Sequence, residues 1–263
     1  MNTLMILRQH ELEELGLYQQ KVNRFLESSH RRERWLGIYR RGQHNTRKLG
    51  YSGTTIEKTL GADGTEYHTT IESKIHVDIF GKGAWLLQRI LGRGFIEING
   101  QMIQDVDLKP MNLSIEVNLP QGTQFHVQGR EDGDSFIVTV HNEAVGLPSL
   151  KIPRDKLELG NGLFPSFPLA GLEEGEAFQI PTFDPVFQRQ EMATVEVVSL
   201  ETQEIDGVLV DLYTLETTFR GTKSKSLVTR DGTLLRTELG PPLDGTILRR
   251  EKEKNARRGV RDD

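Results

Sequence analysis

Histidines are the first residues to consider for chemistry, because imidazole ligates metals and titrates near neutral pH. The seven histidines are His10, His30, His44, His68, His76, His126 and His141. No two of them are four residues apart, the spacing that puts two zinc ligands on one face of a helix. His76 alternates with the polar residues Lys74 and Asp78, and His126 lies opposite its apolar neighbours. The pattern favours solvent-facing histidines and leaves open a site assembled from distant strands.

Other catalytic patterns are equally sparse. Gly81-Lys82-Gly83 lacks the third glycine of a dinucleotide-binding loop, and no Gly-x-Ser-x-Gly elbow occurs. The absence of cysteine removes thiolate metal sites, disulfides and cysteine nucleophiles. Asp132 and Asp134 follow Glu131, but a hairpin tip explains them better than calcium does, since the twelve-residue ligand loop is missing. The sequence therefore predicts a non-enzyme with no catalytic residue, no cofactor and no metal.

A basic run carries the clearest charge signal. It comprises Arg31, Arg32, Arg34, Arg40, Arg41, Arg47 and Lys48. One interpretation is a solvated face. The other is contact with anionic lipid headgroups, and on that interpretation Arg31, Arg32 and Arg34 are predicted to meet a membrane or a protein partner.

An apolar cluster lies at 80–91, where Trp85 and Leu87 are flanked by Lys82, Arg89 and Arg93. It could be a strand or short helix that caps the core, or an apolar lip for a lipid or a partner. On the second interpretation, the predicted ligand-binding residues are Trp85, Leu87, Phe164 and Phe167.

The elements that would position these residues are mostly strands. Leu113, Ile115, Val117 and Leu119 alternate with polar residues, as in an antiparallel sheet with one wet face. Asp-Gly and Asn-Gly pairs punctuate such runs and predict hairpin turns. They occur at Asp63-Gly64, Asn99-Gly100, Asp132-Gly133, Asp206-Gly207 and Asp231-Gly232. Residues 1–34 differ, because apolar residues from Leu4 to Phe25 recur at helical spacing and predict an amphipathic helix.

The predicted organisation has three parts. An N-terminal helix covers residues 1–34, a single antiparallel β domain covers 35–245, and a charged tail that frays covers 246–263. Within the β domain, 147–187 is rich in proline and phenylalanine. Because proline is excluded from central strands, this stretch is predicted to be an ordered crossover packed on the sheet.

Composition limits the partners. The 263 residues are 36% hydrophobic and 27% charged, which is typical of a globular chain with a core. The net charge of −5 argues against a general nucleic-acid binder. No apolar run reaches the roughly 20 residues of a membrane span, and Leu4 to Leu7 is too short for a signal-peptide core.

A family resemblance adds a location. The segments Trp35 to Tyr39, Leu49 to Ser52, Phe183-Asp184-Pro185 and Arg230 to Glu238 resemble a β-rich domain of bacterial cell-envelope proteins, which precedes a transglutaminase-like domain in some of them. The resemblance runs from about residue 35 to 250 and implies a fold similar to the periplasmic lipoprotein-carrier half-barrel. It implies a periplasmic or membrane-associated location and no catalytic residues, although this chain lacks a signal peptide.

The fold expected from the sequence is therefore mainly β, a large curved half-barrel-like antiparallel sheet with an N-terminal α-helix. The expected function is a non-enzymatic, envelope-associated protein that binds an apolar or lipid-like ligand in the curved sheet, with peripheral membrane contact through the N-terminal helix. The alternative is a protein–protein interaction or scaffold module without a small-molecule ligand. A third reading, a hydrolase with a dispersed site, needs titratable groups that converge in a cleft.

Overall fold

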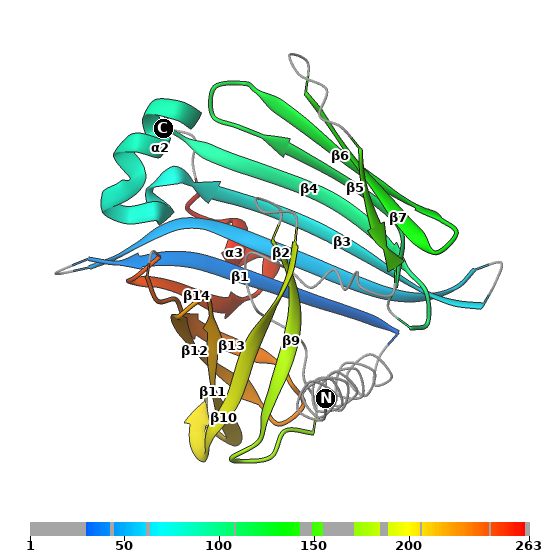
Figure 1. Ribbon diagram of the computed structural model, residues 1–263. Coiled ribbons are helices and arrows are strands. Elements are labelled where there is room, and N and C mark those ends of the chain that lie inside the picture. The colour runs from blue at the N-terminus through cyan, green and yellow to red at the C-terminus, as the bar shows by residue number, and fades with distance from the viewer. Residues whose placement is uncertain are drawn as a thin grey trace, which may run out of the picture. The chain divides into compact units, whose positions relative to one another are not determined.

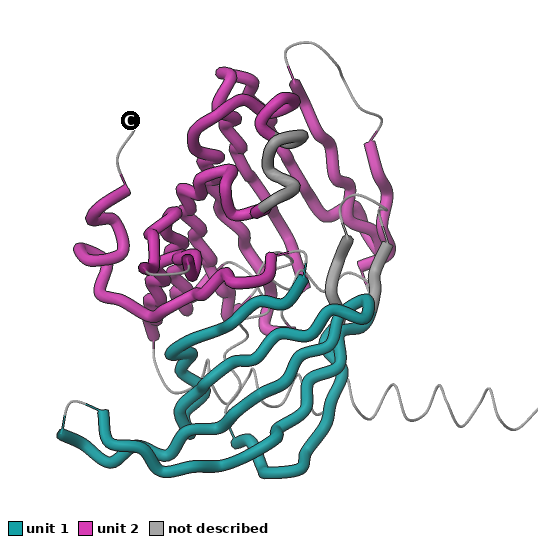
Figure 2. Tube along the Cα trace, turned by 90° about the vertical axis from the view of Figure 1, so that its left-hand side faces the viewer, with its two compact units in different colours: residues 1–29, 159–241 teal, residues 30–158, 242–263 magenta. Residues whose placement is uncertain are grey.

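The computed structural model describes residues 30–42, 45–61, 64–107, 109–142, 149–154, 171–184, 189–205, 207–241 and 243–260, with backbone alone at 82–87, 181–184 and 189–191. The chain divides into two compact units (Figure 2). Unit 1 comprises Met1–Ser29 and Leu159–Pro241, and unit 2 comprises His30–Glu158 and Pro242–Asp263. A single β domain was expected over residues 35–245. The β-rich chain instead divides within that range, because residues 159–241 belong to unit 1 while the residues on both sides of them belong to unit 2.

Unit 2 is an antiparallel sheet of nine strands (Figure 1). In chain order they are β1 (Arg31–Arg41), β2 (Thr46–Gly61), β3 (Gly64–His76), β4 (Phe95–Gln104), β5 (Pro110–Asn118), β6 (Gln124–Asp132), β7 (Ser135–Asn142), β8 (Leu150–Pro153) and β14 (Thr246–Glu251). From β8 to β1 the spatial order is the reverse of the chain order, and β14 pairs with β1 on its other side. The result is a hairpin meander completed by a strand from the far end of the chain.

Short helical segments interrupt this meander at one point and follow it at another. The 3₁₀ segment η1 (Val77–Gly83) and helix α2 (Ala84–Leu91) connect β3 to β4. Helix α3 (Glu253–Arg257) follows β14 and packs against β1 and β2. The residues expected to form a frayed tail after 246 thus include a strand and a helix. Thr246, Leu248 and Ala256 are buried there, which gives this segment a packing role.

Unit 1 holds five antiparallel strands in sequential order. They are β9 (Ala177–Asp184), β10 (Arg189–Ile205), β11 (Val208–Phe219), β12 (Thr222–Thr229) and β13 (Leu234–Glu238). Phe178, Ile180, Val195 and Val197 are buried in this unit. The buried hydroxyls of Ser226 and Thr237 are 2.9 Å apart on neighbouring strands, so each offers the other a hydrogen bond in place of water.

Turn chemistry explains several hairpins. Asp132 pairs with Ser135 across the β6–β7 turn, where Gly133 has a φ of 59° that most side chains avoid. The hairpin predicted at Asp132-Gly133 is confirmed. The turn predicted at Asn99-Gly100 is wrong, because both residues lie inside β4 and Gly100 pairs with Ile115 of β5. A Cβ at Gly100 would come within 3.1 Å of Ile115 Cγ1, so close strand packing accounts for this glycine.

The mainly β, antiparallel character is confirmed, and the predicted N-terminal helix is wrong in the part of it that the structure describes. Arg31 to Arg34, which the sequence analysis placed in a helix over 1–34, form the start of β1 and pair with residues 54–57 of β2. Cross-strand attraction favours this extended pairing, since Arg31 Nη1 lies 2.8 Å from Glu57 Oε1. The α-helices of the described residues are α2 and α3, of eight and five residues. Residues 1–29 lie outside the described part.

The strand arrangement is open. β8 in unit 2 and β9 in unit 1 are terminal strands with a partner on one side only. The half-barrel-like curvature expected from the sequence stays a prediction.

Candidate functional site

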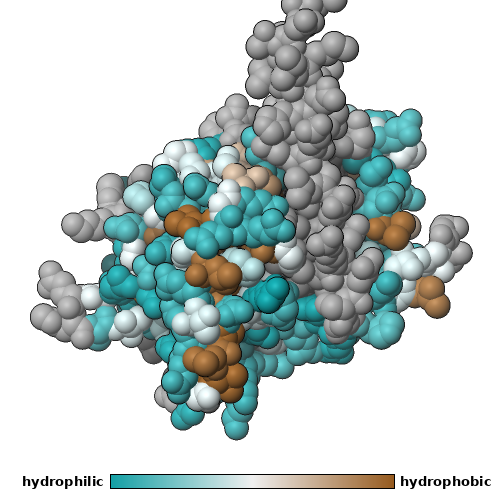
Figure 3. Space-filling model, turned by 90° about the horizontal axis from the view of Figure 1, so that it is seen from below, coloured by the Kyte–Doolittle hydropathy of each residue, from teal (hydrophilic) through white to brown (hydrophobic). Residues whose placement is uncertain are grey.

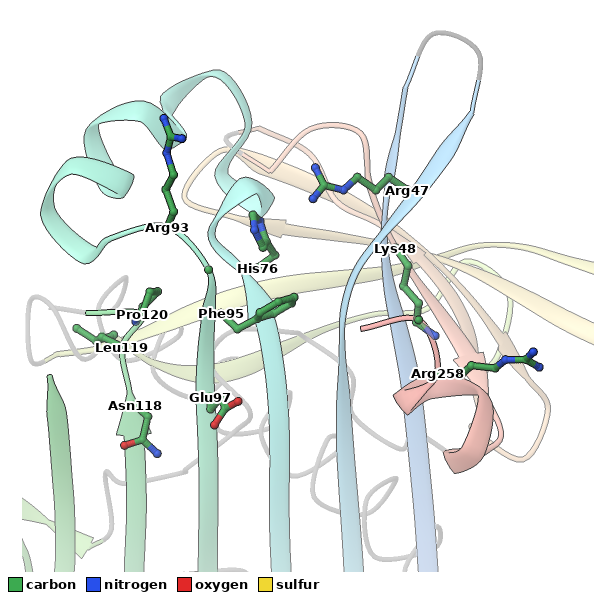
Figure 4. A pocket seen from close by; sticks show the side chains of 12 residues that line it. Arg47, Lys48, His76, Arg93, Phe95, Glu97, Asn118, Leu119, Pro120 and Arg258 are labelled. Atoms are coloured by element: carbon green, nitrogen blue, oxygen red, sulfur yellow. The ribbon is translucent and has the colours of Figure 1, made fainter. Parts of the chain in front are cut away.

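A pocket of about 930 Å³ lies at one edge of the unit 2 sheet (Figure 4). Antiparallel order brings the start of β2, the end of β3, the start of β4 and the end of β5 to this edge. The segment after α3 completes the lining. The lining residues are Arg47, Lys48, His76, Arg93, Gly94, Phe95, Glu97, Asn118, Leu119, Pro120, Arg258 and Gly259. The size is that of pockets that take small organic ligands.

Positive charge dominates this lining. Four lining residues are arginine or lysine, and Glu97 is the one carboxylate among them. Glu97 is itself offset by Lys74, whose Nζ lies 2.9 Å from Glu97 Oε1. A concave surface lined by one sign of charge attracts ligands of the opposite sign, so this pocket suits anions.

Two of the cations are held by the protein. Arg47 Nη1 is 3.1 Å from Asp78 Oδ2, and Asp78 Oδ1 also accepts a 2.7 Å hydrogen bond from Gln88 on α2. Lys48 Nζ is 2.8 Å from Glu251 Oε2 and donates to the carbonyl of Asn255 at 2.6 Å. Lys48 thereby ties β2 to β14 and to α3, and the pocket wall is fixed on that side.

The other two cations have no such partner. The side chains of Arg93 and Arg258 are exposed and form no ion pair or hydrogen bond within the described residues. Figure 4 shows Arg93 on one side of the pocket with Leu119 and Pro120 nearby, and Arg47, Lys48 and Arg258 on the other. These two guanidinium groups remain available to a ligand.

His76 lies between these two sides, next to Phe95. Its ring meets Phe95 edge to face at 5.1 Å between centroids, and its side chain is 18% exposed. The solvent-facing histidine expected from the sequence is therefore mostly covered at this position. Its Nδ1 accepts a 3.2 Å hydrogen bond from the backbone N–H of Asp78. The same Nδ1 also lies 3.3 Å from Asp78 Oδ2.

A second charged cluster lies beside the pocket and is fully compensated. Arg257 in α3 donates through both terminal nitrogens to Glu72 of β3, with Nη2 2.7 Å from Oε2. Its guanidinium carbon lies 4.5 Å from the Trp35 ring centre and 5.4 Å from that of Tyr51. Hydrogen bonding from Arg257 lowers the pKa of Glu72, and burial together with Glu72 raises the pKa of the Tyr51 phenol. This cluster fastens α3 to the sheet.

The predicted site residues are not gathered at this pocket. Trp85 and Leu87 belong to α2, and their side chains, like the whole of Phe164 and Phe167, lie outside the described part. Arg31, Arg32 and Arg34 lie on β1. Burial, followed by the nearby charge of Arg250, lowers the pKa of Arg34 to about 10. The ligand-binding and membrane roles of these residues stay predictions.

The pocket residues were visible in the sequence only in part. Arg47 and Lys48 close the basic run, and Arg93 flanks the apolar cluster, but Arg258 fell in the expected tail. Among the described residues no three histidine, aspartate or glutamate side chains are grouped as metal ligands would be. No helix in the described ranges is both long and apolar enough to cross a membrane.

No protein-family model matches the chain, and no curated protein matches it. Among solved structures, the chain is similar to one from Brucella abortus that is described as a β-barrel-like protein of the domain of unknown function DUF1849. The identity is 12% and the TM-score 0.48, and the match covers 84% of this chain and 95% of that one. The β-rich architecture expected from the sequence is confirmed by the strands of the structure itself, whereas links to the cell envelope and to transglutaminase-like domains stay predictions.

Proposed function

We propose that this protein is a non-enzymatic binding module whose unit 2 pocket takes an amphipathic anion. The observation that carries the proposal is the lining, in which Arg93 and Arg258 lack a partner within the described residues while Phe95, Leu119 and Pro120 supply apolar surface. A guanidinium favours carboxylate or phosphate oxygens, and the apolar side chains favour a hydrocarbon or aromatic body. The ligand is lipid-like in having a charged end and an apolar part.

His76 adds a polar ring to the lining, between the two cationic sides of the pocket. Its Nδ1 lies 3.2 Å from the backbone nitrogen of Asp78 and 3.3 Å from Asp78 Oδ2. An imidazole can donate or accept a hydrogen bond at Nε2, so His76 is suited to contact the polar part of a bound ligand.

The test compares an anionic probe with a neutral one. The anion 8-anilinonaphthalene-1-sulfonate is titrated into the full chain and followed by fluorescence, alongside neutral N-phenyl-1-naphthylamine. We expect single-site binding of the anion, weakened at least tenfold by Arg93→Glu combined with Arg258→Glu. The control is Arg130→Glu, which reverses the charge of an exposed arginine on β6 of the same unit, outside the pocket lining. This control should leave the affinity for the anionic probe unchanged.

Two results would overturn the anionic site. If the double variant binds the anion as well as the unmodified protein does, the pocket is not the site. If the neutral probe binds as tightly as the anion, the ligand is apolar, as the sequence analysis expected. The envelope location remains part of the proposal and is supported by the sequence resemblance; cell fractionation of a bacterium that expresses the protein tests it.

A second candidate function is docking of another protein to unit 1. Val208 and Leu209, at the start of β11, are 61% and 73% exposed. Figure 3 shows several hydrophobic patches among hydrophilic side chains on one face of the molecule. Exposed apolar surface of this kind is typical of interaction sites. Crosslinking in cells with a photoreactive residue at 209, and with one at exposed Lys223 as a control, should give an adduct only from position 209; equal labelling would contradict this candidate.

A further inference from the structure

The pocket retains a net positive charge after every ion pair around it is counted. Three acidic side chains, Glu97, Asp78 and Glu251, offset Lys74, Arg47 and Lys48, their respective partners. Among the arginine and lysine residues of the lining, the surplus is the two positive charges of Arg93 and Arg258. A ligand that carries two negative charges would balance this surplus.

The surplus charges lie apart. Arg93 lies two residues before β4, whereas Arg258 follows α3, which packs on β1 and β2. β3 separates β4 from β2, so the two anchoring points are about two strand spacings apart, roughly 10 Å. Figure 4 shows Arg93 on one side of the pocket and Arg258 on the other, with Phe95 and His76 between them.

The surface between the two charges is partly apolar. The Phe95 ring lies there, packed edge to face against His76. A volume of about 930 Å³ is far more than a single phosphate or carboxylate fills. The space therefore suits a ligand whose charged groups are joined by an apolar body.

We propose that the ligand is an elongated dianion, with a carboxylate at each end and an apolar linker that crosses Phe95. This inference rests on the proposed function and sharpens it, because it assigns one end of the ligand to Arg93 and the other to Arg258. Both side chains are exposed and unpaired within the described residues, so each can turn toward its end of the ligand without breaking an ion pair. A guanidinium then donates two parallel hydrogen bonds to each charged end.

The experiment compares ligands that differ in the number of their carboxylates and in the distance between them. Isothermal titration calorimetry on the full chain compares suberate, which has a carboxylate at each end of an eight-carbon chain, with octanoate, malonate and octanol. We expect suberate to bind at least tenfold more tightly than octanoate, which lacks the second charge, and than malonate, whose charges are adjacent. Octanoate or malonate binding as tightly as suberate would overturn the elongated dianion.

Variants assign the two ends. Arg93→Gln and Arg258→Gln should each reduce the affinity for suberate to near that of octanoate, and each should change octanoate binding by less than threefold. Arg130→Gln serves as the matched control and should change neither. If both pocket variants retain full suberate affinity, the assignment of the ends is overturned. The proposed function itself fails if suberate, octanoate and malonate all fail to bind, or if octanol binds as tightly as they do. This result differs from equal binding of suberate and octanoate, which would overturn the elongated dianion alone.

Discussion

Arg257 and Arg258 are neighbours in sequence at the end of α3, yet their environments are opposite. Arg257 is paired with Glu72 through two nitrogens and covers the rings of Trp35 and Tyr51. Arg258 lines the pocket without an ion pair in the described structure. A compensated charge stabilises the fold, whereas an uncompensated one is available to a ligand. Arg257 therefore fastens α3 to the sheet, whereas Arg258 is available to bind a ligand.

The first test of this contrast removes the compensated charge, and it has the largest expected effect on stability. Arg257→Ala loses two partly exposed ion pairs, with Glu72 and Glu253, and the contact with two aromatic rings. We expect the free energy of unfolding to fall by about 1–2 kcal/mol. Chemical denaturation measures the change. Stability within about 0.3 kcal/mol of the unmodified protein would show that α3 is not fastened by this cluster.

The second test removes the Tyr51 hydroxyl from the same cluster. This hydroxyl donates to Glu72 Oε1 at 2.7 Å and accepts a longer hydrogen bond from Arg257 Nη1 at 3.3 Å. Tyr51→Phe deletes both hydrogen bonds and keeps the ring under Arg257. We expect a loss of about 1 kcal/mol, again by denaturant titration. A loss equal to that of Arg257→Ala would mean that the two residues act as one unit.

The third test uses pH. Because Arg257 holds the pKa of Glu72 below its usual range, the ion pair stabilises the fold above the ordinary glutamate pKa. This contribution is lost as pH falls through the lowered pKa. The stability difference between the unmodified protein and Arg257→Ala should therefore shrink between about pH 5 and pH 3. Thermal melts across that range measure it, and a difference that stays constant would contradict the coupling.

The smallest effect on stability is expected at the neighbouring arginine. Arg258→Ala removes an exposed side chain without an ion pair in the described residues, so unfolding should change by less than about 0.5 kcal/mol. Its affinity for suberate should nevertheless fall about tenfold, which corresponds to about 1.4 kcal/mol. A large stability loss with unchanged binding would reverse the roles assigned to these two arginines.

Strand composition was predictable from the sequence because it is local. Alternation from Leu113 to Val117 marks β5, and the Asp132-Gly133 pair marks the turn that follows β6. Local patterns failed where a distant strand decided the outcome. Asn99-Gly100 has turn chemistry, but pairing with β5 keeps it extended, and Arg31 to Arg34 were assigned to a helix although β2 holds them as a strand.

The candidate site could not be predicted in the same way. Its lining comes from segments as distant as Arg47 and Arg258, and no spacing in the sequence links them. What makes Arg258 part of a pocket is the pairing of β14 with β1 and the packing of α3 on β1 and β2. Without knowledge of the β14–β1 pairing, the charged C-terminal residues are typical of a solvated tail.

The most direct test of the anion site is a crystal structure of the protein with suberate. We expect electron density for suberate in the pocket, with one carboxylate at Arg93, the other at Arg258 and the hydrocarbon chain over Phe95. Suberate bound away from these residues, or a pocket left empty at a ligand concentration that saturates the protein in solution, would contradict it.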